Sequence, residues 1–371
     1  EPDESTSYLV RDNEKCILCR RCVATCKSVQ QVAVIAPSRR GFKTHIGCAF
    51  ESDLADVPCV ACGQCIAVCP TGALHEREEI DNVREAIADP EKVVVVAPAP
   101  AVRAAIGEEF GNPVGTNTEG KMFTALRMLG FDKVFDVNFA ADLTIMEEAN
   151  ELVERVKEGG KLPMFTSCSP GWIRYVEYYY PELIPNLSSC KSPMQMFGAT
   201  VKTYYAQKEG IDPKNIYVVG VMPCTAKKFE RTRDDQSASG YPDIDAVLTT
   251  RELAKMIRTA GILYNELPDG TFDNPLGEFT GAGVIFGATG GVMEAALRTA
   301  AETITGKSLD AVDYKAVRGM QGIKEAEYDL NGLKVKVAVA SGLTNAKALC
   351  EKIRKGECDY TFVEVMCCPG G

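Results

Sequence analysis

From residue 92 onward, short runs rich in valine and isoleucine alternate with segments in which apolar residues recur every three or four positions. The runs are typical of buried β-strands, and the spaced segments are typical of amphipathic helices. Strands are expected at residues 92–100, 133–139, 162–167, 215–224, 244–250, 333–342 and 360–366. Helices are expected at residues 123–130, 144–159, 251–261 and 290–303. This alternation predicts α/β layers with largely parallel sheets that are covered on both faces.

The residues before these elements follow a different pattern. Residues 75–93 are mostly charged as far as Pro90 and predict a polar connector helix. Upstream of them, the chain contains grouped cysteines in place of long apolar runs. We therefore expect one domain at residues 1–80 and a second at residues 81–371.

Cysteine is used unusually often in this chain. Sixteen cysteines in 371 residues indicate metal or redox chemistry, because disulfide scaffolds are typical of much smaller secreted domains. Two runs share the spacing C-x2-C-x2-C-x3-C: the first is Cys16, Cys19, Cys22 and Cys26, and the second is Cys59, Cys62, Cys65 and Cys69. This is the ligand spacing of a two-cluster bacterial ferredoxin, in which the fourth cysteine of each run reaches the other cluster.

The spacing therefore assigns four thiolates to each of two 4Fe–4S clusters. The first cluster takes Cys16, Cys19, Cys22 and Cys69, and the second takes Cys59, Cys62, Cys65 and Cys26. A pair of zinc sites is the alternative, although zinc modules rarely place three cysteines so close together twice. Cys48 lies outside both runs and is expected to be a buried, small apolar residue.

Three predicted strands are followed by cysteine beside proline or glycine. Cys168 follows residues 162–167, Cys224 ends residues 215–224, and Cys367 and Cys368 follow residues 360–366. Ligands of α/β proteins bind at the carboxyl ends of the strands, so these cysteines predict one cleft at the carboxyl edges of the sheets. A buried structural cysteine is the alternative for each of them taken singly.

Charge and hydropathy narrow the class of partner. The formal net charge of −10 argues against nucleic acid, which requires a basic surface. No apolar run approaches the roughly 20 residues that span a bilayer, and no signal peptide is visible at the start. We expect a cytoplasmic protein without a membrane segment.

Two weaker patterns occur in the second domain. The segment GATGG, residues 287–291, lacks the ending of a phosphate loop and is expected to let backbone approach a cofactor or a helix. Glu148, Glu151 and Arg155 are spaced to share one helix face, which on spacing alone favours a solvated, salt-bridged surface.

The segments FTSCSPGW (165–172), VMPCTAKKFE (221–230) and FVEVMCCPGG (362–371), placed after a two-cluster ferredoxin module, together resemble the FeFe (iron-only) hydrogenases. The resemblance covers essentially the whole chain. It implies an α+β ferredoxin-like domain followed by an α/β, two-lobed catalytic domain. It also implies an H-cluster, which is a 4Fe–4S cube joined to a diiron unit that carries CO, cyanide and a dithiolate.

The resemblance also implies the cube ligands. The family's first motif carries two adjacent cysteines: Cys168 matches the thiol that relays protons, and Ser169 stands at the position of a cube ligand. Cys224 and Cys368 match two further ligands. The fourth, bridging cysteine would follow Gly371, and we attribute its absence to truncation of the sequence.

Other roles are implied by position in the same way. Ser188, Glu151 and Glu148, with Arg155 beside them, match a proton relay, which replaces the surface interpretation of that helix face. Lys227 and the backbone near Pro100 match donors to the cyanides. Met222, Met366 and Phe286 match apolar residues that enclose the diiron unit.

Three positions depart from the family pattern. An alkoxide from Ser169 is a harder ligand than thiolate and a poorer match for iron–sulfur iron, so Cys168 or Cys190 is an alternative source of the thiolate. Ala101 and Met194 stand where the nearest relatives carry serine and glutamine, which removes polar contacts near the diatomic ligands.

The resemblance predicts the reversible reduction of protons to H2. Electrons from a ferredoxin- or flavodoxin-type carrier would pass through the two N-terminal clusters to the active-site iron centre. Ser169 motivates the alternative of a catalytically weak or silent iron–sulfur electron-transfer or sensory relative. A cluster-assembly scaffold is a third hypothesis.

Overall fold

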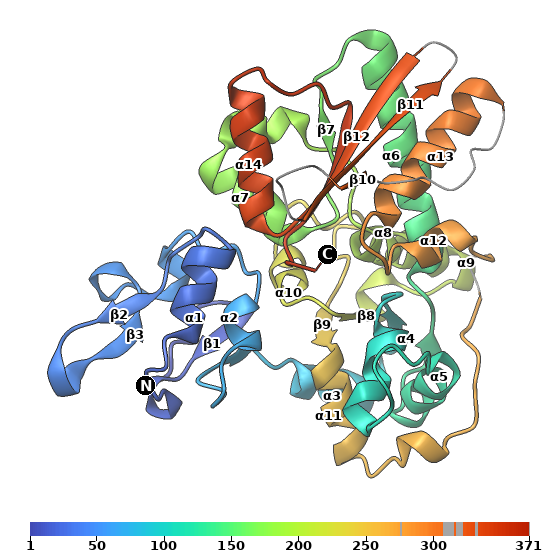
Figure 1. Ribbon diagram of the computed structural model, residues 1–371. Coiled ribbons are helices and arrows are strands. Elements are labelled where there is room, and N and C mark those ends of the chain that lie inside the picture. The colour runs from blue at the N-terminus through green and yellow to red at the C-terminus, as the bar shows by residue number, and fades with distance from the viewer. Residues whose placement is uncertain (275–276, 307–314, 317–321, 331–332, 371) are drawn as a thin grey trace. The chain divides into compact units, whose positions relative to one another are not determined.

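The computed structural model describes residues 1–274, 277–306, 315–316, 322–330 and 333–370. Their packing divides the chain into two compact units, each assembled from separate segments (Figure 1). The first unit comprises Glu1–Arg77, Ile145–Cys190 and Thr289–Gly371. The second comprises Glu78–Thr144 and Lys191–Ala288. The predicted division into domains at residue 80 stays a prediction.

A five-stranded sheet organises the larger part of the first unit. Its strand order is β10-β11-β12-β13-β7. The strands are β7 (Met164–Phe165), β10 (Lys315–Ala316), β11 (Ile323–Leu330), β12 (Leu333–Ser341) and β13 (Phe362–Met366). β7, β13 and β12 are parallel, whereas β11 and β10 continue the sheet antiparallel. The expectation of largely parallel sheets is therefore confirmed for only part of this sheet.

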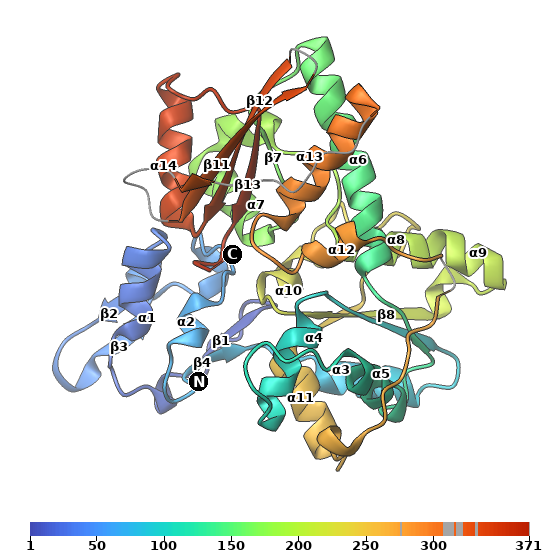
Figure 2. The same cartoon turned by 45° about the vertical axis from the view of Figure 1, so that its right-hand side comes forward.

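Four helices cover the two faces of this sheet (Figure 2). They are α6 (Asn138–Glu158), α7 (Pro170–Tyr179), α13 (Gly291–Thr305) and α14 (Leu343–Arg354). Val335, Val337 and Val339 of β12 pack with apolar residues of α6 and α13, and Ala338 and Ala340 pack with those of α7 and α14. Successive side chains of a strand point to opposite faces, so the continuous apolar run at residues 335–340 serves both cores.

The N-terminal segment of the first unit consists of short elements. Two antiparallel strand pairs join β1 (Leu9–Arg11) to β4 (Leu74–Glu76), and β2 (Ala36–Ser38) to β3 (His45–Gly47). Two one-turn helices, α1 (Arg21–Ala24) and α2 (Gln64–Ala67), begin within the two cysteine runs. Val32 and Val60 of this segment belong to the same apolar cluster as α7 and α14.

The second unit is built on a four-stranded, wholly parallel sheet of order β6-β5-β8-β9. Its strands are β5 (Val93–Pro98), β6 (Lys133–Val134), β8 (Ile216–Met222) and β9 (Ala246–Thr249). Its helices are α3 (Ile80–Ala88), α4 (Val102–Ala105), α5 (Glu119–Met128), α8 (Pro193–Thr200), α9 (Ala206–Glu209), α10 (Ala226–Glu230), α11 (Thr250–Thr259) and α12 (Gly281–Ile285), with the first turns of α6. The strands are almost fully buried, which agrees with their continuous Val/Ile sequences.

The structure corrects two sequence expectations for elements. The connector helix begins at Ile80 and not at His75, because residues 74–76 pair with β1 as β4. The strand expected at residues 133–139 ends at Val134, since Asn138 already begins α6. No helix in the described part of the chain is long and apolar enough to cross a membrane.

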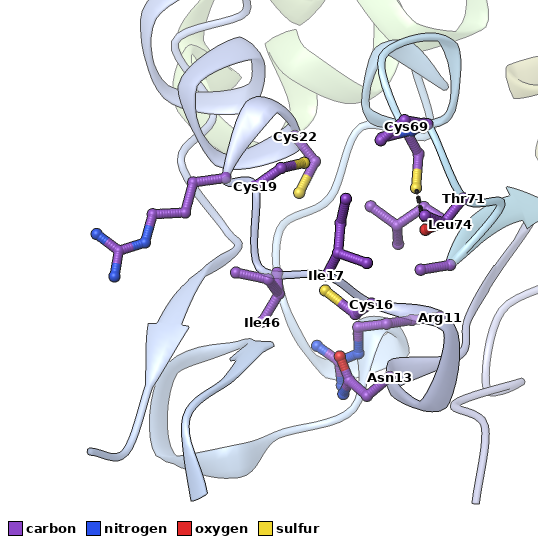
Figure 3. Close-up of a pocket in the computed structure, with 13 residues that line it drawn as sticks. Arg11, Asn13, Cys16, Ile17, Cys19, Cys22, Ile46, Cys69, Thr71 and Leu74 are labelled. Atoms are coloured by element: carbon purple, nitrogen blue, oxygen red, sulfur yellow. Dashed lines mark hydrogen bonds between the residues drawn. The ribbon is translucent and has the colours of Figure 1, made fainter. Parts of the chain in front are cut away.

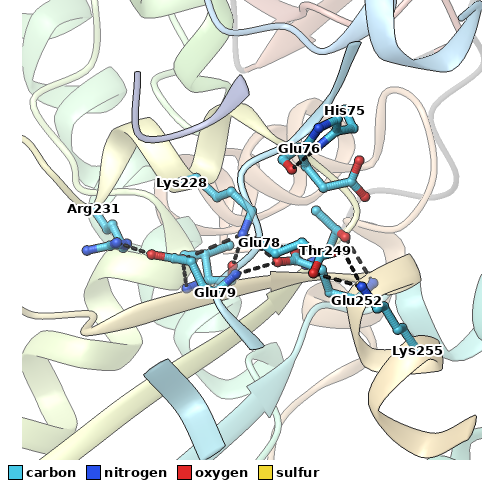
Figure 4. A network of polar contacts seen from close by, with 10 residues as sticks. His75, Glu76, Glu78, Glu79, Lys228, Arg231, Thr249, Glu252 and Lys255 are labelled. Atoms are coloured by element: carbon cyan, nitrogen blue, oxygen red, sulfur yellow. Dashed lines mark hydrogen bonds and ion pairs between the residues drawn. The ribbon is translucent and has the colours of Figure 1, made fainter. Parts of the chain in front are cut away.

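A buried ionic network holds α10 and α11 of the second unit against the start of α3 (Figure 4). The Lys228 ammonium is fully buried and lies 3.0 Å from the Glu252 carboxylate and 3.6 Å from that of Glu79. It also donates to the carbonyl oxygen of Val247 at 2.6 Å, and Arg231 pairs with Glu79. Buried charges are tolerated when they are paired and hydrogen-bonded in this way.

Candidate functional site

Four thiols of the first unit surround one pocket (Figure 3). They belong to Cys16, Cys19, Cys22 and Cys69, and the remaining wall is mainly apolar. Three of them come from a loop whose backbone turns through positive φ at Leu18 and Arg20. Cys69 arrives from the other run, so the four thiols that the sequence groups for the first cluster share a pocket.

The second run repeats this local geometry. Ala61 and Gly63 adopt positive φ at the positions that correspond to Leu18 and Arg20. Burial raises the pKa of the Cys65 thiol well above its ordinary value, and the neighbouring thiols of Cys62, Cys59 and Cys26 raise it further. The second predicted group is therefore also gathered in one place.

The donor chemistry of both groups fits 4Fe–4S clusters. Each offers four cysteine sulfurs, the ligand set that such clusters take, and each is completed by a cysteine from the opposite run. Cys48 joins neither group: it is buried, and its sulfur accepts a hydrogen bond from Arg11 Nη1 at 3.4 Å.

The carboxyl ends of β7 and β13 bring two of the strand-end motifs together. These strands are parallel neighbours, and the Val365 amide donates to Thr166 Oγ1 at 3.3 Å. Beyond them, the Cys367 amide donates to Ser169 Oγ at 3.2 Å. Cys168 and Ser169 therefore lie beside the Cys367–Cys368 turn, although about 200 residues separate them along the chain.

The turn at residues 367–370, called the terminal turn below, is anchored from the segment just before α13. Thr289 Oγ1 donates to the carbonyl oxygen of Gly370 at 2.8 Å. Glu364, two residues before Met366, accepts hydrogen bonds from the amides of Gly290 at 3.0 Å and Met293 at 2.7 Å. Gly290 has a φ of 87°, which favours glycine. The GATGG segment thus places the Gly290 amide on a buried carboxylate, a function that sequence reasoning missed.

The predicted relay residues form a hydrogen-bonded chain within the first unit. Arg155 pairs with Glu151 at 2.6 Å, and the Ser188 hydroxyl donates to the same carboxylate at 2.8 Å. Ser188 is held beside β7 because its amide donates to the carbonyl oxygen of Phe165 at 2.8 Å. The polar chain therefore runs from the half-buried Arg155 toward the end of β7, where Cys168 follows.

Glu148 is the buried member of this group. Its side chain is 0% exposed, and among the described residues neither carboxylate oxygen makes a hydrogen bond of normal length. Burial raises the pKa of Glu148 to about 7; Glu151 and Glu364 add to this rise, while the Ser167 amide and the Ser188 hydroxyl oppose it. A carboxyl group with a pKa near neutrality is suited to accept and release protons.

Cys190, the alternative thiolate, belongs to the same group. Its sulfur lies 3.7 Å from Glu151 Oε2, and its amide donates to Ser188 Oγ at 3.2 Å. Burial raises the pKa of Cys190 to about 12, and the neighbouring carboxylates of Glu148 and Glu151 disfavour its thiolate further. Its contacts therefore lead to the carboxylates of α6.

The other predicted site residues belong to the second unit. Cys224 lies two residues after the end of β8, and burial raises the pKa of its thiol while the nearby Lys227 lowers it. Lys227 pairs with Glu230 at 2.8 Å. Met194 and Met222 are buried and lie next to Gly220. A Cβ added to Gly220 would lie 3.2 Å from the Met194 sulfur and 3.3 Å from the Met222 methyl carbon.

Gly287 lies against the backbone of Pro100 and Ala101, where an added Cβ would come within 3.7 Å of Pro100 and 3.6 Å of Ala101. Phe286 ends α12 directly before this glycine and is half-buried. The predicted site residues thus form one set in each unit, and the single cleft expected from the strand ends stays a prediction.

Comparison with known proteins identifies the class. Residues 92–371 match the family described as iron-only hydrogenase large subunit, C-terminal domain, and residues 15–73 match the 4Fe-4S dicluster domain. The chain belongs to the iron-only hydrogenase family, and the expected ferredoxin-like domain followed by an α/β domain is confirmed.

Particular relatives are similar over long stretches. The chain is 52% identical to iron hydrogenase 1 of Clostridium pasteurianum over 370 residues, which cover 100% of this chain and 64% of that protein. It is 47% identical to the periplasmic Fe hydrogenase large subunit of Nitratidesulfovibrio vulgaris, over 85% of this chain and 83% of that one. A solved apo FeFe-hydrogenase from Chlamydomonas reinhardtii aligns with a TM-score of 0.73 and 44% identity, over 80% of this chain and 83% of that chain. The chain therefore spans less than two thirds of iron hydrogenase 1.

Proposed function

We propose that the protein catalyses the reversible reduction of protons to H2 at an H-cluster, in an α/β domain with two lobes. The observation that carries this proposal is the polar chain Arg155–Glu151–Ser188 with the buried acid Glu148, which leads toward Cys168 in a chain of the hydrogenase family. An isolated electron-transfer module has no use for such a path. A proton-reducing enzyme must supply protons to a site that excludes water.

Three sets of residues would hold the metal groups. The first N-terminal cluster would take Cys16, Cys19, Cys22 and Cys69, and the second would take Cys26, Cys59, Cys62 and Cys65. Cys224, Cys368 and Ser169 would ligate the cube. When bound, the H-cluster supplies the iron site at which H2 is formed and split, and the protein supplies ligation, orientation and proton delivery.

Proton movement is the task of the residues on α6 and β7. Arg155 holds Glu151 by an ion pair, and Glu151 is bonded to Ser188. Glu148, with a pKa near 7, would receive protons from this chain and pass them toward the Cys168 thiol. Losing a general acid of this kind typically costs a factor of about 10² to 10⁴ in rate.

The second unit would supply the surroundings of the diiron unit. Lys227 and the backbone near Pro100 would donate hydrogen bonds to the cyanides, and Met222 and Phe286, with Met366 of the first unit, would exclude water. Ala101 and Met194 offer no hydrogen bond there, and we expect them to shift the electronic tuning of the diiron unit.

Electrons would enter through the first N-terminal cluster. Cys19 is exposed and is followed by the exposed Arg20 and Arg21, a basic rim on a chain whose net charge is −10. Such a rim suits an acidic carrier of the ferredoxin or flavodoxin type. We propose a cytoplasmic location, where such carriers are available.

A weak or silent electron-transfer or sensory relative is the second candidate, and Ser169 is the observation that favours it. The two candidates differ in measurable ways. In the protein matured anaerobically, the hydrogenase proposal expects infrared bands of CO and cyanide together with H2 evolution from reduced carrier. Bands without H2 evolution support the sensory relative, and absence of both contradicts an H-cluster.

A further inference from the structure

A second cysteine of the terminal turn has no role in the assignments above. Cys367 is 5% exposed and belongs to the apolar cluster that joins α7 to the N-terminal segment. A Cβ added to Gly171 would lie only 2.8 Å from the Cys367 sulfur, so the space that this thiol occupies depends on the absence of a side chain at Gly171. The Cys367 thiol shares a hydrogen bond with Cys62, a member of the second thiol group.

Gln30 binds the same turn from the N-terminal segment. Its side chain is fully buried, and its amide nitrogen lies 3.0 Å from the Cys367 carbonyl oxygen and 3.9 Å from the Cys367 sulfur. The same side chain also hydrogen-bonds to Cys62. Its carbonyl oxygen accepts from the Leu343 amide at 3.3 Å. Gln30 therefore fixes the terminal turn against the second thiol group.

Gln64 makes the corresponding contact to the next cysteine. It lies between Cys62 and Cys65, and its amide nitrogen is 3.9 Å from the sulfur of Cys368. This one side chain therefore connects the loop of the second thiol group to a residue proposed to hold the cube.

We propose that Cys367, Gln30 and Gln64 form a hydrogen-bonded junction that sets the reduction potentials of the second N-terminal cluster and of the group bound by Cys368. This inference rests on the proposed ligand roles of Cys62 and Cys368. Hydrogen bonds to cluster sulfurs stabilise the reduced, more negative state and so raise the potential. The Cys367 thiol and the Gln30 amide act on Cys62, and the Gln64 amide acts on Cys368.

The junction makes Cys367 a positioning residue and not a ligand. Its sulfur is directed toward Cys62 and Gly171, while its amide is the group that donates to Ser169 Oγ. To ligate the cube in place of Ser169, Cys367 would have to turn its sulfur away from the second thiol group.

The first experiment removes the thiol of Cys367 in the full chain reconstituted under argon. We expect Cys367→Ala to keep the bound iron and sulfide, to make the EPR-monitored midpoint of the second N-terminal cluster more negative, and to leave the first cluster unchanged. Cys367→Ser retains a donor and should restore most of the shift. Cys350→Ala, which removes an equally buried thiol from α14, is the matched control and should change no midpoint.

Two outcomes would overturn the role of Cys367. Unchanged midpoints in Cys367→Ala would show that the thiol does not act on the second N-terminal cluster. Loss of iron from the group bound by Cys368 would make Cys367 a ligand. The potentials of the N-terminal clusters are measurable whether or not the protein evolves H2. Failure of the junction and failure of the proposed activity are therefore distinguishable.

The second experiment removes the Gln64 amide. Gln64→Leu keeps the approximate size of the side chain, and we expect it to make the midpoint of the Cys368-bound group more negative at unchanged iron content. Gln207→Leu on the exposed surface of α9 is the control. Equal midpoints in both variants and the unmodified chain would contradict a contact between Gln64 and the bound group.

Discussion

Cys168 follows the end of β7, toward which the polar path runs, and its thiol is the proposed last carrier of the proton. We predict that Cys168→Ala leaves the fold and both N-terminal clusters intact, and lowers H2 evolution by at least about a hundredfold, as expected for the loss of a general acid. Activity and iron content measured on the same matured sample check this. Near-normal activity would contradict the relay role, and loss of cube iron would make Cys168 a ligand.

Ser169 stands at the position proposed for a cube ligand. Its oxygen accepts the Cys367 amide at 3.2 Å, so a backbone donor is already directed at the ligand position. We predict that Ser169→Cys raises bound iron, shifts the midpoint of the cube and raises H2 evolution, because thiolate is the softer ligand for iron–sulfur iron. If none of the three quantities changes, Cys168 or Cys190 supplies the thiolate.

Glu148 makes stability depend on pH. Its pKa of about 7 in the folded chain exceeds the ordinary value of 4.5, so the folded state binds more protons between these pH values and loses stability as the pH rises. Glu148→Gln carries no charge. The free energy of unfolding of Glu148→Gln minus that of the unmodified chain should therefore rise by up to roughly 3 kcal/mol between pH 5 and pH 8.

Urea denaturation under argon at several pH values measures this difference. Glu151 and Glu364 face Glu148 and are unchanged in both proteins, so their titration largely cancels. Glu158→Gln, at the exposed end of the same helix, is the control and should show no such dependence. A difference that does not change with pH would mean that Glu148 is not the titrating group.

At the scale of elements, the position of α10 matters because Cys224 lies two residues before it and Lys227 lies in its first turn. Lys228, the next residue, is locked between Glu79 and Glu252. We predict that Lys228→Met destabilises the protein by about 3–5 kcal/mol, since it leaves the buried Glu252 carboxylate without its cationic partner. Lys255→Met is the matched control: Lys255 pairs with Glu78 at the surface, and its loss should cost under about 1 kcal/mol (Figure 4). Equal destabilisation of the two variants would contradict a special role for the buried network.

At the scale of the whole molecule, the N-terminal segment contributes both ligands and packing. We predict that a fragment of residues 1–80, reconstituted anaerobically, binds about eight iron atoms, four for each cysteine group. It should melt at a lower temperature than the full chain, because Val32 and Val60 lose their contacts with α7 and α14. Iron analysis and a melting curve followed through the cluster absorbance check both parts. Markedly fewer irons would contradict the crossed ligand assignment.

The sequence by itself determined the features that depend on local spacing. Four thiols within eleven residues, repeated once, define two cluster sites, and the Val/Ile runs define the buried strands, because ligand spacing and strand periodicity are local properties. Even here β4 was missed, since its partner β1 lies more than sixty residues away. The chemistry of Cys168, Ser169 and Cys368 came from motif resemblance, and their roles stay predictions.

Only the tertiary structure decided which distant residues meet. Gln30 and Cys367 are 337 positions apart, and Gln64 and Cys368 are 304 apart, so no local pattern relates them. The same holds for the burial of Glu148 and Lys228, since a carboxylate or ammonium on a helix face looks solvated in sequence until its neighbours are known. Burial and long-range hydrogen bonds are properties of the packed chain, and they set the pKa of Glu148 and the surroundings of Cys367.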